Sequence, residues 1–79
     1  MINAYIFLRM QPGNSDEAIQ KMRKIENVEK ISVVAGDYDI VVRVHVKNLE
    51  KLLEVTNNIQ MIKDVKKTTT QVIEKEIAL

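Results

Sequence analysis

Residues 33–46 read VVAGDYDIVVRVHV, and their pattern predicts two strands joined by a short hairpin. In the second half of this stretch every other residue is apolar, as one face of a strand buried against a core requires. The connection AGDY (35–38) is short enough for a hairpin, and Gly36 can adopt the positive φ angle that such turns need. We therefore expect one strand from about Val28 to Val34 and the next from about Asp39 to Val46.

The residues before this hairpin predict a strand followed by a helix. From Ile2 to Met10 the side chains alternate between two faces, which is typical of a strand. The sequence QPGN (11–14) is typical of a turn, and Asn14 or Ser15 can cap the helix that follows. The apolar residues of that helix recur at three- and four-residue spacing, at Ala18, Ile19, Met22 and Ile25.

A second helix and a last strand are predicted after the hairpin. Asn48 is suited to cap the helix, which should end near Ile59 to Ile62. Its predicted apolar face consists of Leu49, Leu52, Leu53, Val55 and Ile59. The segment from Val65 to about Glu74 is rich in β-branched residues and predicts a strand. The resulting order, βαββαβ, predicts an α+β fold of ferredoxin-like arrangement, with a four-stranded antiparallel sheet and both helices on one face.

The sheet face away from the helices should carry an unusual patch. If the aliphatic side of residues 40–46 faces the helices, the alternate side chains of this strand and of the first strand face away from them. This outward set consists of Tyr5, Phe7 and Val41, ringed by Arg9, Arg43 and His45. Apolar patches with a polar rim usually mark an interface, so we expect two sheets to pack face to face as a dimer through Tyr5, Phe7, Val41, Arg43 and His45.

Composition excludes several classes of function. Residues 1–79 form one domain without a linker, and a core this small favours self-association. The absence of cysteine excludes thiolate metal sites and fits a cytoplasmic protein, while no apolar run is long enough to span a membrane. The 12 basic and 11 acidic residues nearly cancel, which argues against direct nucleic-acid binding. With one histidine and no nucleophile-base pair or phosphate loop, we expect neither an enzyme, nor a metal site, nor a cofactor.

Three stretches together resemble a known family. They are VEKI (28–31), VVAGDYDI (33–40) and the segment from Val65 through TTTQVI (68–73). They are similar to the RAM domain, named for regulation of amino-acid metabolism, which is the effector-binding half of the Lrp/AsnC or feast/famine transcriptional regulators. Two departures stand out. Met1 opens directly onto the first strand instead of following a helix-turn-helix domain, and residues 62–65 lack the Pro-Gly common before the last strand in relatives.

The resemblance implies a function as well as a fold. It implies a dimer through the sheet faces, then a ring of dimers, commonly an octamer, with an amino-acid effector bound where dimers meet. The implied ligand-binding residues are Gly36, Asp37, Tyr38, Asp39, Thr68 and Thr70. A carboxylate suits the ammonium of a free amino acid, and hydroxyls or backbone N–H groups suit its carboxylate. Without a DNA-reading half, such a stand-alone module is expected to modulate Lrp/AsnC-type regulators by pairing with their RAM domains.

Plainer interpretations exist for each of these residues. Gly36 and the two aspartates are also ordinary hairpin residues, Tyr38 can simply cover the hairpin, and threonines are good strand formers. Because alternate residues of a strand face opposite sides, only Thr68 and Thr70 pair as site candidates, and Thr69 does not. Two alternatives to the sensor therefore stay open, an ACT-like amino-acid-binding domain and a scaffold that binds no ligand.

Overall fold

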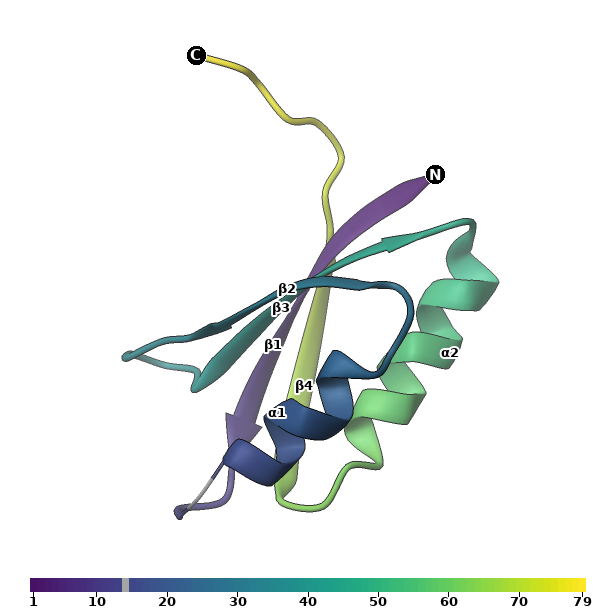
Figure 1. The fold of residues 1–79 in the computed structure, drawn as a ribbon. Helices are drawn as coiled ribbons and strands as arrows, with labels where there is room; N and C mark the ends of the chain where they lie inside the picture. Colours follow the sequence, from purple (N-terminus) through teal and green to yellow (C-terminus); the bar gives the residue numbers. More distant parts are fainter. Residues whose placement is uncertain (14) are drawn as a thin grey trace.

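The computed structural model describes residues 1–13 and 15–79, and its elements follow the order βαββαβ. Their bounds are β1 Ile2–Met10, α1 Asp16–Arg23, β2 Val28–Val33, β3 Ile40–Val46, α2 Leu49–Gln60 and β4 Val65–Val72. The predicted ferredoxin-like fold is confirmed (Figure 1). The capping role expected of Asn14 lies outside the described residues.

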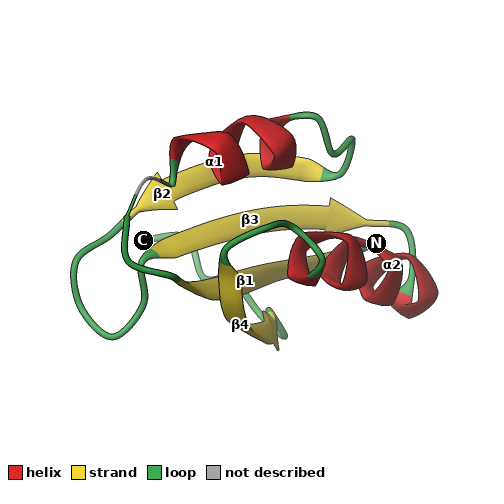
Figure 2. Ribbon diagram, turned by 90° about the horizontal axis from the view of Figure 1, so that it is seen from below, coloured by secondary structure: helices red, strands yellow, loops and turns green. Residues whose placement is uncertain are grey.

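The sheet is antiparallel, with strand order β2-β3-β1-β4, and Figure 2 shows the strands side by side in this order. Tyr5 pairs with Arg43 and Phe7 with Val41, so the side chains of β1 and β3 alternate in step. Both helices lie on the same side of the sheet. By this order β1 and β3 are the central strands, and β2 and β4 are the edges.

The core lies between the helices and one face of the two central strands. β3 alternates between buried and half-buried residues along its whole length, and from Ala4 onward β1 alternates between buried residues and residues that are half-buried or exposed. The buried set consists of Ala4, Ile6, Leu8 and Met10 from β1, Ile40, Val42, Val44 and Val46 from β3, and Ala18, Met22, Leu52, Val55 and Ile59 from the helices. The edge strands contribute only partly buried side chains to this core.

The helix boundaries show which local signals operate. The Asn48 side chain accepts a hydrogen bond of 2.8 Å from the Lys51 N–H, which confirms the predicted cap of α2. Ser15 stands at the N-cap position of α1, but its side chain makes no capping hydrogen bond. Ile25 lies beyond the last helical residue and still packs against the core.

Part of the predicted apolar face of α2 is wrong. Leu49 and Leu53 are 60% and 64% exposed, whereas Leu52, Val55 and Ile59 are buried. Leu49 and Leu53 lie one turn apart on the same stripe, and the sheet covers only the neighbouring stripe. Five apolar residues in twelve exceed what one covered face can bury, so two of them remain in contact with solvent.

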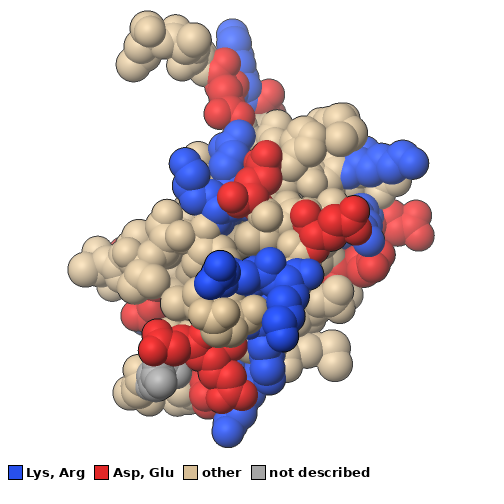
Figure 3. All heavy atoms as spheres, viewed as in Figure 1, with Lys and Arg blue, Asp and Glu red and all other residues tan. Residues whose placement is uncertain are grey.

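The surface charges are mixed. Figure 3 shows Lys and Arg gathered in a band down the middle of the face that carries the helices, with Asp and Glu on either side. In α1 the acidic residues occupy the first turn and the basic ones the last, as the helix dipole favours. The formal net charge is only +1, so the overall charge gives no reason to expect tight binding to a phosphate backbone.

Candidate functional site

The face of the sheet opposite the helices is uncovered in the single chain, and we refer to it as the open face. It is formed by Asn3, Tyr5, Phe7 and Arg9 of β1 and by Val41, Arg43 and His45 of β3. Most of these side chains are half-buried by one another, and Tyr5 is 37% exposed. The sequence-based expectation that these residues share one face is confirmed by the strand register.

Arg43 organises one end of the open face. Its guanidinium lies 5.4 Å from the centre of the Tyr5 ring and donates to the Tyr5 hydroxyl at 3.2 Å. It also donates to the Glu76 carboxylate at 2.8 Å and lies 3.5 Å from that of Glu29. The hydrogen bond with Glu76, and then that with Tyr5, raise the pKa of Arg43 above its ordinary value. This end of the open face therefore carries a positive charge, and hydrogen bonds to Tyr5 and Glu76 hold the guanidinium in place.

Aromatic rings continue the open face toward the hairpin. The Tyr5 and Phe7 ring centroids are 6.3 Å apart, and those of Phe7 and Tyr38 are 5.3 Å apart. The Arg9 guanidinium lies 5.6 Å from the centre of the Tyr38 ring. The Tyr38 hydroxyl is within 3.3 Å of the Thr69 hydroxyl on β4. Tyr38, expected as a ligand residue, thus extends the apolar row of the open face.

Thr69 is the residue at this site that the sequence reasoning set aside. It pairs with Phe7 and therefore faces the open side of the sheet. The alternation that separated it from its two threonine neighbours already placed it there, but nothing local indicated that Tyr38 would reach it across 31 residues. A hydroxyl pair at this position holds the hairpin down onto the sheet.

The hairpin loop, residues 34–39, is longer than the predicted four residues and is anchored at its base. The Val34 N–H donates to the Asp39 carbonyl, and the Asp39 N–H donates to the Leu8 carbonyl, both at 2.9 Å. The Asp39 carboxylate accepts a 2.7 Å hydrogen bond from the Met10 N–H. Gly36 has a φ angle of 148°, which confirms the predicted need for glycine.

The two loop carboxylates therefore differ in what they do within one chain. Asp39 fixes the loop to the end of β1, while Asp37 is exposed near the tip. A hollow of about 420 Å³ opens beside the base of the loop. It is lined by Met10, Gln11, Pro12, Gly13, Ser15, Val33, Val34 and Asp39. Asp39 is the only predicted ligand residue among the described residues that line this hollow.

Thr68 and Thr70 lie on the other side of the sheet. They pair with Leu8 and Ile6, whose side chains point into the core, so both threonines face the helices from the edge strand. The Thr68 hydroxyl donates to the Gln60 side chain of α2 at 2.7 Å. The six predicted ligand residues are thus divided among the loop, the open face and the helix side of β4, and one chain does not bring them together.

The far end of the open face holds the single histidine. His45 Nδ1 lies 2.6 Å from the Asn3 side-chain oxygen, a pairing that suits a sheet-face residue. Within residues 1–13 and 15–79, no cluster of three or more His, Cys, Asp or Glu side chains is arranged to hold a metal ion. Over the same residues, no helix has the length and apolar character needed to cross a membrane.

Comparison with known proteins places this fold in a family. The model of the Lrp/AsnC ligand binding domain matches residues 3–78. The HTH-type transcriptional regulator FL11 of Pyrococcus furiosus is 30% identical over 74 residues, which are 94% of this chain and 49% of that protein. The homocitrate synthase of Sulfolobus acidocaldarius is 38% identical over 53 residues, 67% of this chain and 11% of the enzyme. The chain thus spans about half of the regulator and a small part of the synthase.

Solved structures have the same fold as this chain. TTHA0845 from Thermus thermophilus superposes with a TM-score of 0.90 at 25% identity, each chain covered completely. The feast or famine regulatory protein Rv3291c of Mycobacterium tuberculosis, solved with L-methionine, has a TM-score of 0.85 at 24% identity and shares the fold over 54% of its length. With a family model that matches nearly every residue and the same fold in these structures, the chain belongs to the Lrp/AsnC ligand-binding, or RAM, domain family.

Proposed function

We propose that this domain is an amino-acid-sensing regulatory module that acts through its assembly state. The observation that carries the proposal is that Tyr38 lies on the open face while Thr68 and Thr70 lie on the helix side of the sheet, with the rest of the loop between them at the end of β1. Such a division leaves no complete site in a single chain, and a site can form only where chains meet. A ligand bound there stabilises the assembled state over the separated one, since it binds only the former.

The first contact in this assembly is a dimer through the open face. Two copies would stack their rows of Tyr5, Phe7 and Tyr38 side by side and cover Val41, while Arg43 and His45 lie toward the rim. Sheets packed face to face lie about 10 Å apart, which leaves room for one layer of interdigitated rings. The same surface meets itself across a two-fold axis, as in most homodimers.

The second contact would join dimers into a ring, commonly an octamer in this family, and create the ligand site. Gly36, Asp37 and Asp39 of one dimer would meet Thr68 and Thr70 of the next, with Tyr38 close by. The exposed Asp37 carboxylate suits the ammonium group of an amino acid, and Asp39 keeps the loop in place through Met10. Support for an amino acid comes from the M. tuberculosis relative, which was solved with L-methionine.

The partners of this module are inferred from its relatives. Similar sequences occur in a transcriptional regulator and in a small part of a homocitrate synthase, so this similarity is found in proteins of different function. We place this chain in the cytoplasm as a non-enzymatic module that modulates Lrp/AsnC-type regulators by pairing with their RAM domains. Its formal net charge of only +1 argues against direct DNA binding.

Calorimetric titration with the common amino acids tests the sensor. We expect at least one of them to bind, Asp37→Asn to weaken that binding about 10-fold or more, and Glu50→Gln on α2 to leave it unchanged. Light scattering with and without the ligand should show a change in assembly. No heat with any amino acid, together with an unchanged assembly of the Asp37→Asn protein, would instead identify a scaffold that binds no ligand.

The alternative of a ligand-free scaffold has one specific observation in its favour. One oxygen of the Asp39 carboxylate is already used by the Met10 N–H within the chain, so this residue has a sufficient structural role without any ligand. The ACT-like alternative is not supported by the family comparison, because the model that matches residues 3–78 is that of the Lrp/AsnC ligand binding domain.

A further inference from the structure

Two leucines of α2 remain uncovered in the single chain and form an apolar ridge. Leu49 and Leu53 lie one turn apart on one stripe of the helix and are both exposed. Gln60 lies on the same stripe two turns beyond Leu53, and its side-chain oxygen accepts a 2.7 Å hydrogen bond from Thr68 of β4. The ridge therefore runs along the side of α2 that faces the β4 edge of the sheet.

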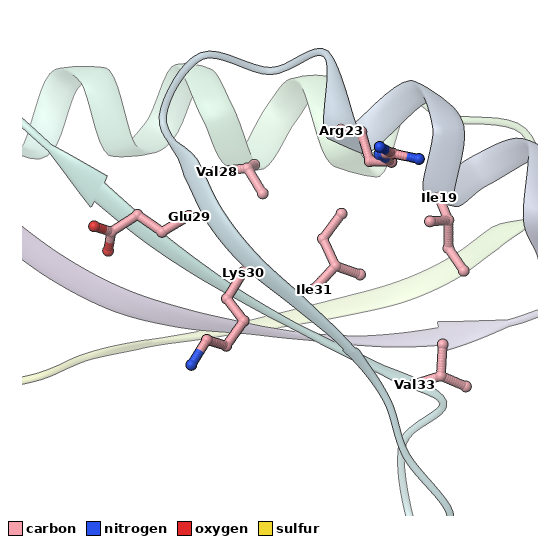
Figure 4. Close-up of a pocket in the computed structure, with 7 residues that line it drawn as sticks. All are labelled: Ile19, Arg23, Val28, Glu29, Lys30, Ile31 and Val33. Carbon is pink, nitrogen blue, oxygen red and sulfur yellow. The ribbon is translucent and has the colours of Figure 1, made fainter.

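A groove of matching character lies at the other edge of the sheet, between α1 and β2. It has a volume of about 430 Å³, and α1 lies along β2 beside it (Figure 2). Figure 4 shows Ile19 of α1 and Ile31 of β2 pointing into the groove, while Glu29 and Lys30 point away. Val33 at its end is 71% exposed. The helix side of the sheet thus carries an apolar ridge at one edge and an apolar groove at the other.

The directions of the elements suit a contact between this ridge and the groove of a second copy. β3 and β4 run the same way, because both are antiparallel to β1. α2 connects them and therefore runs back in the opposite direction, which is the direction of β2. A copy placed alongside in the same orientation, with its β2 edge next to the β4 edge of the first, sets its groove parallel to the ridge.

The lengths and charges of the two surfaces also match. From Leu49 to Gln60 the helix rises about 17 Å, and the six residues of β2 span about the same distance. Arg23 lines the groove from α1, and Glu54 stands on α2 next to the ridge. Helices that present apolar residues four apart to a groove are a recurring mode of protein recognition.

We infer that the ridge of Leu49 and Leu53 docks head to tail into the α1–β2 groove of a copy in the neighbouring dimer, and that this contact closes the ring. A head-to-tail contact forms a ring when the rotation from one copy to the next closes. This inference rests on the assembly proposed above and names the surfaces that hold it together. Both surfaces lie on the helix side, so the open face remains available for the dimer.

The docking also accounts for how a ligand site forms between dimers. The loop 34–39 follows directly after Val33 at one end of the groove, and Thr68 lies beside Gln60 at the corresponding end of the ridge. With α2 and β2 parallel, these two ends meet. The loop of one dimer then lies next to the β4 threonines of the next.

Sedimentation of two variants and of their mixture tests the pairing. Leu49→Ser/Leu53→Ser alters the ridge, and Val33→Asp alters the groove; all three side chains are exposed, so both proteins should fold. We expect each variant to stop at dimers where the unaltered protein forms larger assemblies, because the contact between dimers weakens about 10-fold or more. An equal mixture should assemble again, since the intact groove of one protein receives the intact ridge of the other.

A control and a contrary result complete this experiment. Met61→Ser changes an exposed residue at the end of α2 that lies off the ridge, and it should assemble as the unaltered protein does. Loss of assembly in both variants without recovery in their mixture would overturn the pairing of these two surfaces.

Cross-linking tests the alignment, and the absence of cysteine from the sequence makes it specific. A Val33→Cys protein mixed with a Gln60→Cys protein should form a disulfide-linked pair under mild oxidation. A Leu49→Cys protein, altered at the opposite end of the ridge, should not cross-link with the Val33→Cys protein. Cross-linking through Leu49→Cys in place of Gln60→Cys would mean reversed docking and would overturn the head-to-tail arrangement.

The outcomes separate this inference from the proposed function. Undiminished assembly of both variants overturns the docking and leaves the open-face dimer and the sensor intact. A ring that depends on both surfaces but binds no amino acid supports the docking and overturns the sensor. An unaltered protein that never assembles beyond a dimer overturns the docking together with the ring.

Discussion

The two faces of the sheet are built from the same two strands but from different side chains. On the helix side, β1 and β3 present aliphatic residues, of which Ile6, Val42 and Val44 are completely buried. On the open side, the alternate positions carry aromatic rings and charged groups, among them Tyr5 and Arg43, that cover one another only in part. The helix side is therefore complete within one chain, whereas the open side has ring and guanidinium surfaces available to a partner.

This difference separates folding from association along one strand. Residues 40–46 alternate between a core role and a surface role at each step. Substitutions on the helix side should lower the stability of the single chain. Neighbouring substitutions on the open side should act mainly on assembly.

The largest effect is expected on the helix side. Ile6 is fully buried, and Ile6→Ala leaves a cavity that helices on a small sheet cannot fill. We expect the free energy of unfolding to fall by about 3 kcal/mol. Urea denaturation at one fixed protein concentration measures this, since dimerisation also contributes to apparent stability. A loss below about 1 kcal/mol would show that the core is looser than its burial indicates.

The adjacent residue should respond differently. Phe7→Ala removes the ring that contacts both Tyr5 and Tyr38 on the open face, so we expect dimerisation to weaken by about 2 kcal/mol, or roughly 30-fold. Sedimentation over a concentration series measures the dissociation constant. Thr56→Ser on α2, which lies on the opposite side of the sheet from the open face, serves as a control that should leave it unchanged. Equal dimerisation of the Phe7→Ala protein would remove the distinction between the two faces.

Alternation was sufficient to predict both faces because a strand offers only two sides. Given that Ile40 and Val42 are buried, Val41 and Arg43 must point outward, and no tertiary information is needed. Spacing alone could not predict which stripe of α2 is buried, because Leu49 and Leu53 fit the helical spacing as well as Leu52 does. Which stripe is buried depends on how the helix sits on the sheet, and local spacing does not contain that information.

At the candidate site, too, local sequence patterns do not contain the tertiary contacts. The sequence located the loop and the glycine with a positive φ angle, because turn chemistry is local. It did not locate the contacts of Tyr38 with Thr69 or of Asp39 with Met10, which join residues 31 and 29 positions apart. Such contacts depend on strand order and loop direction together, and a shift of one residue in register would remove them.

A medium effect is expected at Asp39, whose side chain holds the hairpin loop to the end of β1. Asp39→Ala removes the acceptor of the Met10 N–H, so we expect a loss of about 1–2 kcal/mol in the free energy of unfolding. Asp39→Asn keeps a side-chain oxygen at this position and should recover at least half of the loss. Denaturation of the two variants side by side gives the difference. Equal losses would mean that the charge, and not the hydrogen bond, holds the loop.

The smallest effect concerns the turn before β4, which contains Lys63 and Asp64. Asp64 has a φ angle of 74°, a conformation that costs a side chain with a Cβ about 1–2 kcal/mol, at the lower end for aspartate. Glycine relieves that strain but loses about 0.5–1 kcal/mol in backbone entropy, so Asp64→Gly should stabilise the domain by at most about 1 kcal/mol.

The opposite substitution, Gly36→Ala in the hairpin, tests the same cost of a positive φ angle in a residue that has a Cβ. A Cβ at Gly36 would meet nothing within 4 Å, so Gly36→Ala should destabilise only through its φ angle of 148°, by about 1 kcal/mol or more. Urea midpoints of the two variants should therefore move in opposite directions with unchanged slopes. A fall in the midpoint of Asp64→Gly would mean that the aspartate side chain contributes more to this turn than its backbone strain costs.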